Sequence, residues 1–219
     1  MIYQDGGKRI WRDRVGAAEK LKAIAQEIEI CTDCELHASR KKSVPGEGPA
    51  DSDLMFIGEG PGFHENEQGK PFVGAAGRFL EDLLAIIDLK REDVFIGNVV
   101  KCRPPGNRDP QPEEIEACGK YLEHQIEAID PKVIVTLGRF SMARYFPDTR
   151  ISKIHGQAKE IDGRLIVPMY HPAAALHQPS LRKVIEADFS MLPELIEKEA
   201  SISQPDQLTP VDPEQLELF

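Results

Sequence analysis

The chain has 219 residues, 41% of them hydrophobic, which fits one α/β domain with extensions or at most two small domains. It has no apolar run near the roughly 20 residues that a membrane span requires, and its first residues lack a signal peptide's apolar region, so we expect a soluble protein of the cytoplasm. The net charge of −10 does not exclude nucleic acid as a partner, because −6 of it falls in residues 194–219, which hold seven acids and one lysine.

The apolar pattern predicts alternating helices and strands. Helices are expected over 17–30, 74–88, 112–129, 139–145 and 181–198, strands over 54–57, 93–100 and 133–137, a hairpin over 158–161 and 165–169, and a polar loop over 63–72. This order predicts a three-layer α/β/α sandwich with a central, mainly parallel four-stranded sheet. The folded domain is expected over residues 16–198, between a poorly ordered start (1–15) and a disordered acidic tail (199–219).

The first predicted strand ends in a glycine-rich turn, Gly58-Glu59-Gly60-Pro61-Gly62. Ligands of open α/β sheets bind at the carboxyl ends of the strands, so this turn is the first candidate for a binding site. Its glycines allow a ligand to approach the backbone closely, and Glu59 adds a carboxylate. An ordinary strand-to-helix turn would have the same appearance.

Four cysteines suggest metal or redox chemistry more than disulfides in a cytoplasmic protein. Cys31 and Cys34 form a chelating pair, whereas Cys102 and Cys118 are separated by fifteen residues. Four thiolates suit zinc or an iron–sulfur cluster, and the open spacing of the second pair favours the cluster. Reduced cysteines in the core are the remaining alternative, which leaves the Cys31–Cys34 pair unexplained.

Three further residues are candidates for binding a planar polar ligand. His171 follows a strand and precedes a proline, which holds it extended at the same sheet edge as Gly58. Asn98 lies near the end of an apolar strand, where its amide must be satisfied by the backbone or by a ligand. Phe72 lies in a loop, where it either fills a gap in the core or stacks on a ligand.

Taken in order, these segments resemble the family 4 uracil-DNA glycosylases, the iron–sulfur group found in bacteria and archaea. The resemblance extends from about Cys31 to Met191. It rests on four motifs and on the positions of all four cysteines: Gly58–Gly62, Gly69-Lys-Pro-Phe-Val-Gly74, Asn98-Val-Val-Lys-Cys-Arg-Pro-Pro-Gly-Asn107 and His171-Pro-Ala-Ala-Ala-Leu176. Phe63 and His64 depart from the acidic residues that are frequent at these positions in the family.

The resemblance implies a uracil pocket and an enzyme that hydrolyses the N-glycosidic bond of uracil in DNA. Phe72 would stack on the flipped base, Asn98 would bind its polar edge, and His171 would stabilise the charge that develops on it. The backbone of Gly58, Glu59 and Gly60 would line the pocket. Gly60 occupies the position of a water-activating side chain in the wider superfamily. Glu65 is therefore the first candidate to position the water, to exclude the 5-methyl group of thymine, or to do both, and Glu59 is the second candidate.

The resemblance also implies a cofactor and a DNA contact surface. Cys31, Cys34, Cys102 and Cys118 would bind a 4Fe–4S cluster. Leu176 would enter the space left by the flipped base, and Lys101 and Arg108 are candidate DNA contacts. The expected partner is uracil-containing DNA, single- or double-stranded, bound by a monomer. A glycosylase for another deaminated base, such as hypoxanthine, and a catalytically weak iron–sulfur module that binds nucleic acid are the alternatives.

The last five residues, Gln215-Leu-Glu-Leu-Phe219, resemble the short motif by which bacterial polymerases and repair proteins bind the sliding clamp. In such a motif a glutamine and a Leu/Phe pair anchor a flexible peptide in an apolar groove. Gln215, Leu218 and Phe219 are therefore the candidate partner-binding residues. A chance amphipathic end on an acidic tail is the alternative.

Overall fold

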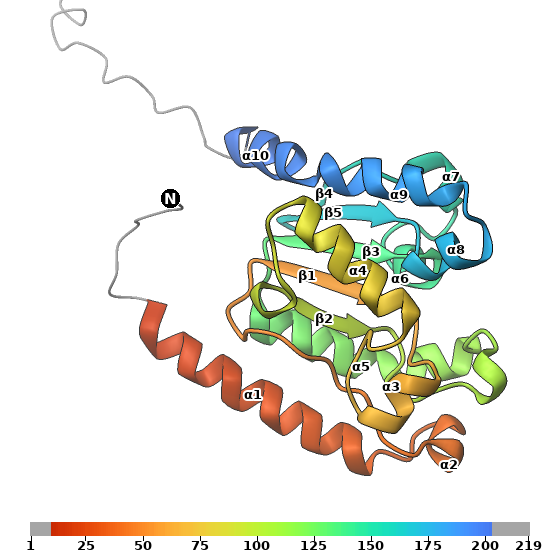
Figure 1. Ribbon diagram of the computed structural model, residues 1–219. Helices are drawn as coiled ribbons and strands as arrows, with labels where there is room; N and C mark the ends of the chain where they lie inside the picture. The colour runs from red at the N-terminus through yellow and green to blue at the C-terminus, as the bar shows by residue number, and fades with distance from the viewer. Residues whose placement is uncertain (1–9, 203–219) are drawn as a thin grey trace, which may run out of the picture.

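The computed structural model describes residues 10–202 of the chain, and side chains within residues 16–197. A five-stranded sheet of order β2-β1-β3-β5-β4 forms its centre (Figure 1). The strands are β1 (Leu54–Gly58), β2 (Phe95–Asn98), β3 (Val133–Leu137), β4 (Lys159–Ile161) and β5 (Arg164–Met169). The first four in space are parallel, whereas β4 is antiparallel to β5. The sheet has one strand more than expected, because both arms of the predicted hairpin belong to it.

Helices cover both faces of the sheet, as the predicted sandwich requires. Helices α4 and α9 lie on one face and α5 on the other, with α1 packed along α5 (Figure 1). The helices are α1 (Ile10–Ile30), α2 (Leu36–Ser39), α3 (Phe63–Gln68), α4 (Ala75–Ile86), α5 (Pro112–Ile129), α6 (Arg139–Ala143), α7 (Ile151–Ile154), α8 (Pro172–His177), α9 (Leu181–Ser190) and α10 (Leu192–Ile202). Two 3-10 turns, η1 (Arg91–Asp93) and η2 (Pro105–Asn107), flank β2.

Each face of the sheet has its own apolar core. Successive side chains of a strand point to opposite faces, so Phe56 packs toward α4 and α9 while Met55 and Ile57 pack toward α5. Burial on both faces explains why the strands read as continuous apolar runs. Ile24 and Ile28 of α1 join the α5 core, which extends that layer.

Several element boundaries differ from those expected. Helix α1 begins at Ile10 rather than Ala17. The predicted polar loop contains α3, in which the Glu65 carboxylate caps the helix by accepting a hydrogen bond from the Gly62 N–H at 3.1 Å. The predicted last helix is divided into α9 and α10 beside Pro193, which fits the first turn of a helix but not its interior.

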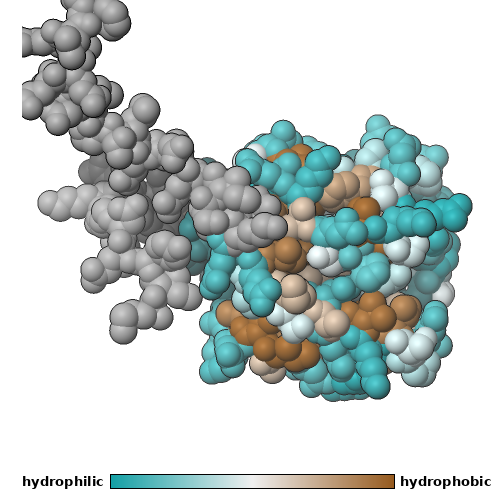
Figure 2. Space-filling view, turned by 90° about the horizontal axis from the view of Figure 1, so that it is seen from above, coloured by the Kyte–Doolittle hydropathy of each residue, from teal (hydrophilic) through white to brown (hydrophobic). Residues whose placement is uncertain are grey.

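The view onto α9 and α10 shows a mostly hydrophilic surface with separate apolar patches (Figure 2). Within the described part of the chain, no helix has the length and apolar character needed to cross a membrane. The predicted clamp motif, including Gln215, Leu218 and Phe219, lies outside the described residues.

Candidate functional site

The parallel strands place the candidate residues at one edge of the sheet. Gly58, the last residue of β1, is in register with Asn98, the last residue of β2. Strand β5 leads at the same edge to His171, which precedes α8. The loop before α4 adds Phe72, so the structure brings together four of the sequence-predicted site residues.

Asn98 and Phe72 meet where Gly58 has no side chain. A Cβ atom at Gly58 would overlap the Asn98 side-chain oxygen and lie 2.7 Å from Cζ of Phe72. Asn98 is buried, and its Oδ1 is among the few buried side-chain atoms of the described residues that have no hydrogen-bond partner. Such an acceptor is costly in an apolar interior, so it points to a ligand that donates a hydrogen bond.

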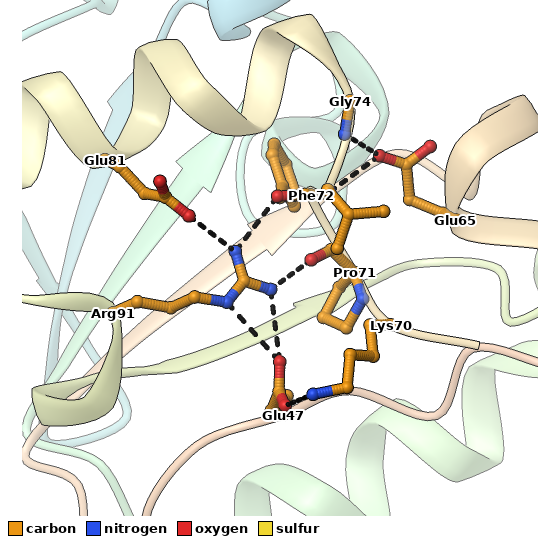
Figure 3. Close-up of polar contacts among 9 residues, drawn as sticks. Glu47, Glu65, Lys70, Pro71, Phe72, Gly74, Glu81 and Arg91 are labelled. Atoms are coloured by element: carbon orange, nitrogen blue, oxygen red, sulfur yellow. Dashed lines mark hydrogen bonds and ion pairs between the residues drawn. The ribbon is translucent and has the colours of Figure 1, made fainter. Parts of the chain in front are cut away.

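The loop that carries Phe72 is bound from both sides (Figure 3). Glu65 Oε1 accepts hydrogen bonds from the N–H groups of Val73 and Gly74, both at 2.9 Å. Arg91 donates to the carbonyl oxygens of Pro71 and Phe72. The backbone of Phe72 has φ +52°, a left-handed conformation that is uncommon outside glycine.

His171 is arranged as a neutral hydrogen-bond donor. Its Nδ1 accepts a hydrogen bond from the Ala173 N–H at 3.1 Å, which caps α8 and leaves the ring proton on Nε2. Burial lowers the pKa of His171 to about 4, although the Glu65 carboxylate opposes this shift. Its ring stacks with that of Phe72, with 5.4 Å between the centroids.

The two candidate carboxylates differ in their surroundings. Glu65 is nearly buried, and its two oxygens accept from three backbone N–H groups, which gives it a structural role that the sequence did not reveal. Glu59 is partly buried, and burial raises its pKa, with a further rise from Asp109 and an opposing effect from Arg139. Of the two, Glu59 is therefore the carboxylate whose oxygens can accept a further hydrogen bond.

The four cysteines come together from three separate segments: the turn after α1, the stretch after β2, and α5. With Ile28, Arg40 and Tyr121 among their neighbours, they line one narrow site between α1, α2 and α5. Arg40 Nη1 approaches Cys102 Sγ at 3.4 Å, and the Lys101 N–H approaches Cys118 Sγ at 3.3 Å. Within the described range, no three His, Cys, Asp or Glu residues form a group that could hold a single metal ion.

This set of thiols is compatible with an iron–sulfur cluster. Burial raises the pKa of the Cys34, Cys102 and Cys118 thiols, that of Cys118 to about 11. Thiolates at such positions therefore need the positive charge of a bound metal. Hydrogen bonds to cysteine sulfur, such as those from Arg40 and Lys101, are typical of iron–sulfur sites.

The three residues predicted to contact DNA differ in how far their side chains are exposed. The prediction for Lys101 is wrong: its side chain is buried and donates to the Asn98 carbonyl oxygen at 2.9 Å and to Gln125 Oε1 at 2.6 Å. Burial also lowers the pKa of Lys101 to about 8. Arg108 pairs with the buried Glu114, at 2.6 and 2.9 Å. Leu176 of α8 is 49% exposed, as a side chain that enters DNA must be.

Sequence reasoning missed Arg91 and Glu47, which hold the Phe72 loop, and it missed the contact of Arg40 with the cysteines. Arg91 lies on a short turn and Glu47 in a Pro/Gly-rich loop, so no periodic pattern marks either residue. The only available signal for Arg40 is its distance of six positions along the chain from Cys34.

We expect His171 to remain neutral, with its proton on Nε2, down to about pH 5 and to titrate near pH 4, because burial opposes its charged form. Nitrogen-15 NMR of the histidine rings measures this, and His171→Gln assigns the signal. Since the pKa of the unfolded chain is about 6.5, the histidine's contribution to stability is lost as the pH falls from 6.5 toward 4. Titration of His171 near pH 6.5 would contradict this assignment.

Comparison with known proteins agrees with the geometry. The family model of the Uracil DNA glycosylase superfamily matches residues 45–190. The chain is 48% identical over 189 residues to a type-4 uracil-DNA glycosylase of Archaeoglobus fulgidus, covering 82% of this chain and 95% of the relative. It is 41% identical over 186 residues to a type-4 uracil-DNA glycosylase of Thermotoga maritima, covering 83% of this chain and 97% of the relative.

A third relative, a type-4 uracil-DNA glycosylase of Saccharolobus solfataricus, is 48% identical over 197 residues, covering 85% of this chain and 89% of the relative. A type-5 uracil-DNA glycosylase of Pyrobaculum aerophilum is more distant, at 29% identity over 150 residues. Both the extent and the level of identity therefore favour the type-4 group. The chain belongs to the uracil DNA glycosylase superfamily and, within it, to the type-4 uracil-DNA glycosylases.

Proposed function

We propose that this chain is a monofunctional uracil-DNA glycosylase, which hydrolyses the bond between uracil and deoxyribose in DNA and leaves an abasic site for base excision repair. Its membership of the type-4 group supports this activity. Within the molecule, the observation that carries the proposal is the buried Asn98 Oδ1, which lacks a partner among the described residues and lies beside the Phe72 ring. The N3–H group of uracil supplies the missing donor.

Recognition begins when uracil leaves the base stack, because its glycosidic bond is inaccessible in a duplex. The base then stacks on Phe72, and the Asn98 amide offers an acceptor for N3–H and a donor for O4. Gly58 allows the base to approach the end of β1, because a Cβ atom there would overlap Asn98 and Phe72. A base with a different pattern of donors and acceptors leaves the Asn98 amide unsatisfied.

In the bond-breaking step, the C1′–N1 electron pair stays with uracil, which leaves as an anion, and a water oxygen bonds to C1′ and loses a proton. His171 donates its Nε2–H to the uracil O2 as negative charge develops there. A neutral imidazole serves as this donor because Nδ1 is occupied by the Ala173 N–H. A preorganised donor of this kind lowers the barrier by about 2.7–4 kcal/mol.

We assign the activation of the attacking water, by accepting its proton, to Glu59. Its raised pKa makes it a stronger base than an ordinary exposed carboxylate, and it belongs to the loop that follows β1. Glu65, the first choice from the sequence, uses its oxygens to bind the N–H groups of Gly62, Val73 and Gly74. Gly60 contributes close packing, because a Cβ atom there would lie 2.7 Å from Val100.

The proposed DNA contacts lie on segments that follow strands at the same edge of the sheet. The exposed Leu176 would fill the space that the flipped base leaves in the duplex. Arg108 keeps about a third of its side chain exposed while paired with Glu114, so it can approach a phosphate without breaking that pair. We infer that the enzyme acts on DNA as a monomer.

An excision assay tests this function on oligonucleotides that contain U·G, U·A, single-stranded U, hypoxanthine or T·G. We expect abasic product from the uracil substrates, and a 10²- to 10³-fold lower single-turnover rate for His171→Ala and for Asn98→Ala, because each removes a group that binds the leaving base. His124→Ala, an exposed histidine of α5, is the matched control and should retain activity. Absence of product from every uracil substrate would refute the function, and full activity of either site variant would refute that residue's role.

We also propose that Cys31, Cys34, Cys102 and Cys118 bind a 4Fe–4S cluster with a structural role. All four cysteines line one site, where a cluster would be bound. It would join the end of α1 and the following segment to Cys102 after β2 and to Cys118 on α5. We assign bond cleavage to the residues of the pocket alone.

The purified protein should therefore be brown, with broad visible absorption, and should contain about four irons per chain with labile sulfide. Cys118→Ala should lose this absorption and lower the thermal unfolding temperature, because the link between α1 and α5 is lost. Glu116→Gln, at an exposed position on the same helix, serves as the control. A colourless preparation that contains zinc would contradict the cluster.

The last five residues carry a separate proposal. Gln215, Leu218 and Phe219 would anchor the tail in the apolar groove of a sliding clamp, with the preceding Ser-, Pro- and Gln-rich segment as a linker. Deletion of residues 215–219 should abolish binding to the clamp of the source organism, measured by surface plasmon resonance, and leave uracil excision from short oligonucleotides unchanged. Clamp binding that survives the deletion would refute this role.

A further inference from the structure

The Phe72 ring is placed in the site by a backbone conformation that is unfavourable for an aromatic residue. Phe72 has φ +52°, whereas an aromatic residue normally avoids the left-handed region. Helix α4 packs directly on this segment, since a Cβ atom at Gly77 would overlap the Phe72 carbonyl. Contacts from outside the loop must therefore hold the ring beside Gly58 and His171.

Arg91 supplies such a contact (Figure 3). Its Nη1 donates to the Phe72 carbonyl oxygen at 3.0 Å, and its Nη2 donates to the carbonyl oxygen of Pro71. The guanidinium is itself fixed by Glu47, whose Oε2 lies 3.4 Å from Nε and 3.3 Å from Nη2. Its side chain is only 23% exposed, so these bonds are partly shielded from water.

Glu47 connects this contact to the edge of the sheet. Its backbone exchanges two hydrogen bonds with Ile96 of β2, at 2.9 and 2.8 Å. Its carboxylate also accepts from Lys70, in the loop before Phe72, at 2.8 Å. Asn98 lies two residues after Ile96 on the same strand. Arg91 thus ties the residue that stacks on the base to the strand that reads its polar edge.

We propose that Arg91 is a positioning residue for uracil excision: it holds the Phe72 ring at the place and angle where the flipped base stacks, in register with Asn98. This inference rests on the proposed function, in which Phe72 contacts uracil. Arginine is suited to the task because its planar fork donates to two carbonyls and a carboxylate at once. Lysine has one nitrogen and cannot make the same set of contacts.

The test compares Arg91→Met and Arg91→Lys with the wild-type holoenzyme. We expect Arg91→Met to lower the single-turnover rate of uracil excision by roughly 10- to 100-fold, because a small displacement of a group at the reacting site has effects of this size. Arg91→Lys keeps the positive charge beside Glu47, so its excision rate should lie between those of the wild type and Arg91→Met. The control is Glu92→Gln on the same 3-10 turn, since its exposed carboxylate lies 3.8 Å from Lys90 and its loss should leave the rate unchanged.

Two measurements separate positioning from a general loss of structure. Arg91→Met should bind an oligonucleotide with an abasic-site analogue as the wild type does, but bind one with uncleavable 2′-fluoro-deoxyuridine more weakly, because only the latter has a base to stack. In a Phe72→Ala background, Arg91→Met should slow excision by no more than about twofold further, since both changes remove the same contribution.

Effects of Arg91→Met and Phe72→Ala that multiply in the double variant would overturn the proposal. So would equal weakening for both DNA probes, or a loss of rate that follows a loss of thermal stability and visible absorption in both Arg91 variants. Wild-type excision of uracil in the same assay keeps this result separate from the proposed function. If the wild type excises no uracil, the function itself fails.

Discussion

Asn98 keeps an amide oxygen in the interior, where it accepts no hydrogen bond from any described residue. A buried acceptor without a partner costs about 1–3 kcal/mol, so the fold retains it only with compensation elsewhere. The register of β1 and β2 creates this situation, because it places Asn98 beside Gly58, which has no side chain to cover it. In the proposed function, this arrangement would select a base that donates a hydrogen bond.

The segment after β2 joins the two chemical centres of the molecule. Lys101 donates through its backbone N–H to Cys118 and through its side chain to the carbonyl oxygen of Asn98. Cys102 follows directly, and Arg40 links its sulfur to the carbonyl oxygens of Ile28 and Cys31 at the end of α1. The cysteine site and Asn98 therefore share one short stretch of backbone, through which the proposed cluster would support the proposed pocket without entering it.

Hydrogen bonds from side chains to the backbone hold the loops of the site. Glu65 binds the N–H groups of Val73 and Gly74 on one side of Phe72, and Arg91 binds carbonyl groups on the other. His171 is fixed in the same way, since its Nδ1 accepts from the Ala173 N–H. Charged side chains thus orient the backbone of the site, while the side chains that would meet the base in the proposed function, Asn98 and His171, are neutral.

The sequence by itself was sufficient for the layers of the fold, the family, and the residues that meet at the sheet edge. Apolar runs, glycine-rich turns and the Pro172 that follows His171 act over a few neighbouring positions, so they can be read locally. The tertiary structure alone decided the roles of Lys101, Glu65 and Arg91. Their partners lie at other places in the fold: Arg91 binds carbonyls some twenty positions earlier, and Lys101 turns inward toward Gln125 rather than outward to DNA. Which charged side chain is buried, and against which carbonyl, depends on how loops pack on one another, and no local pattern encodes that.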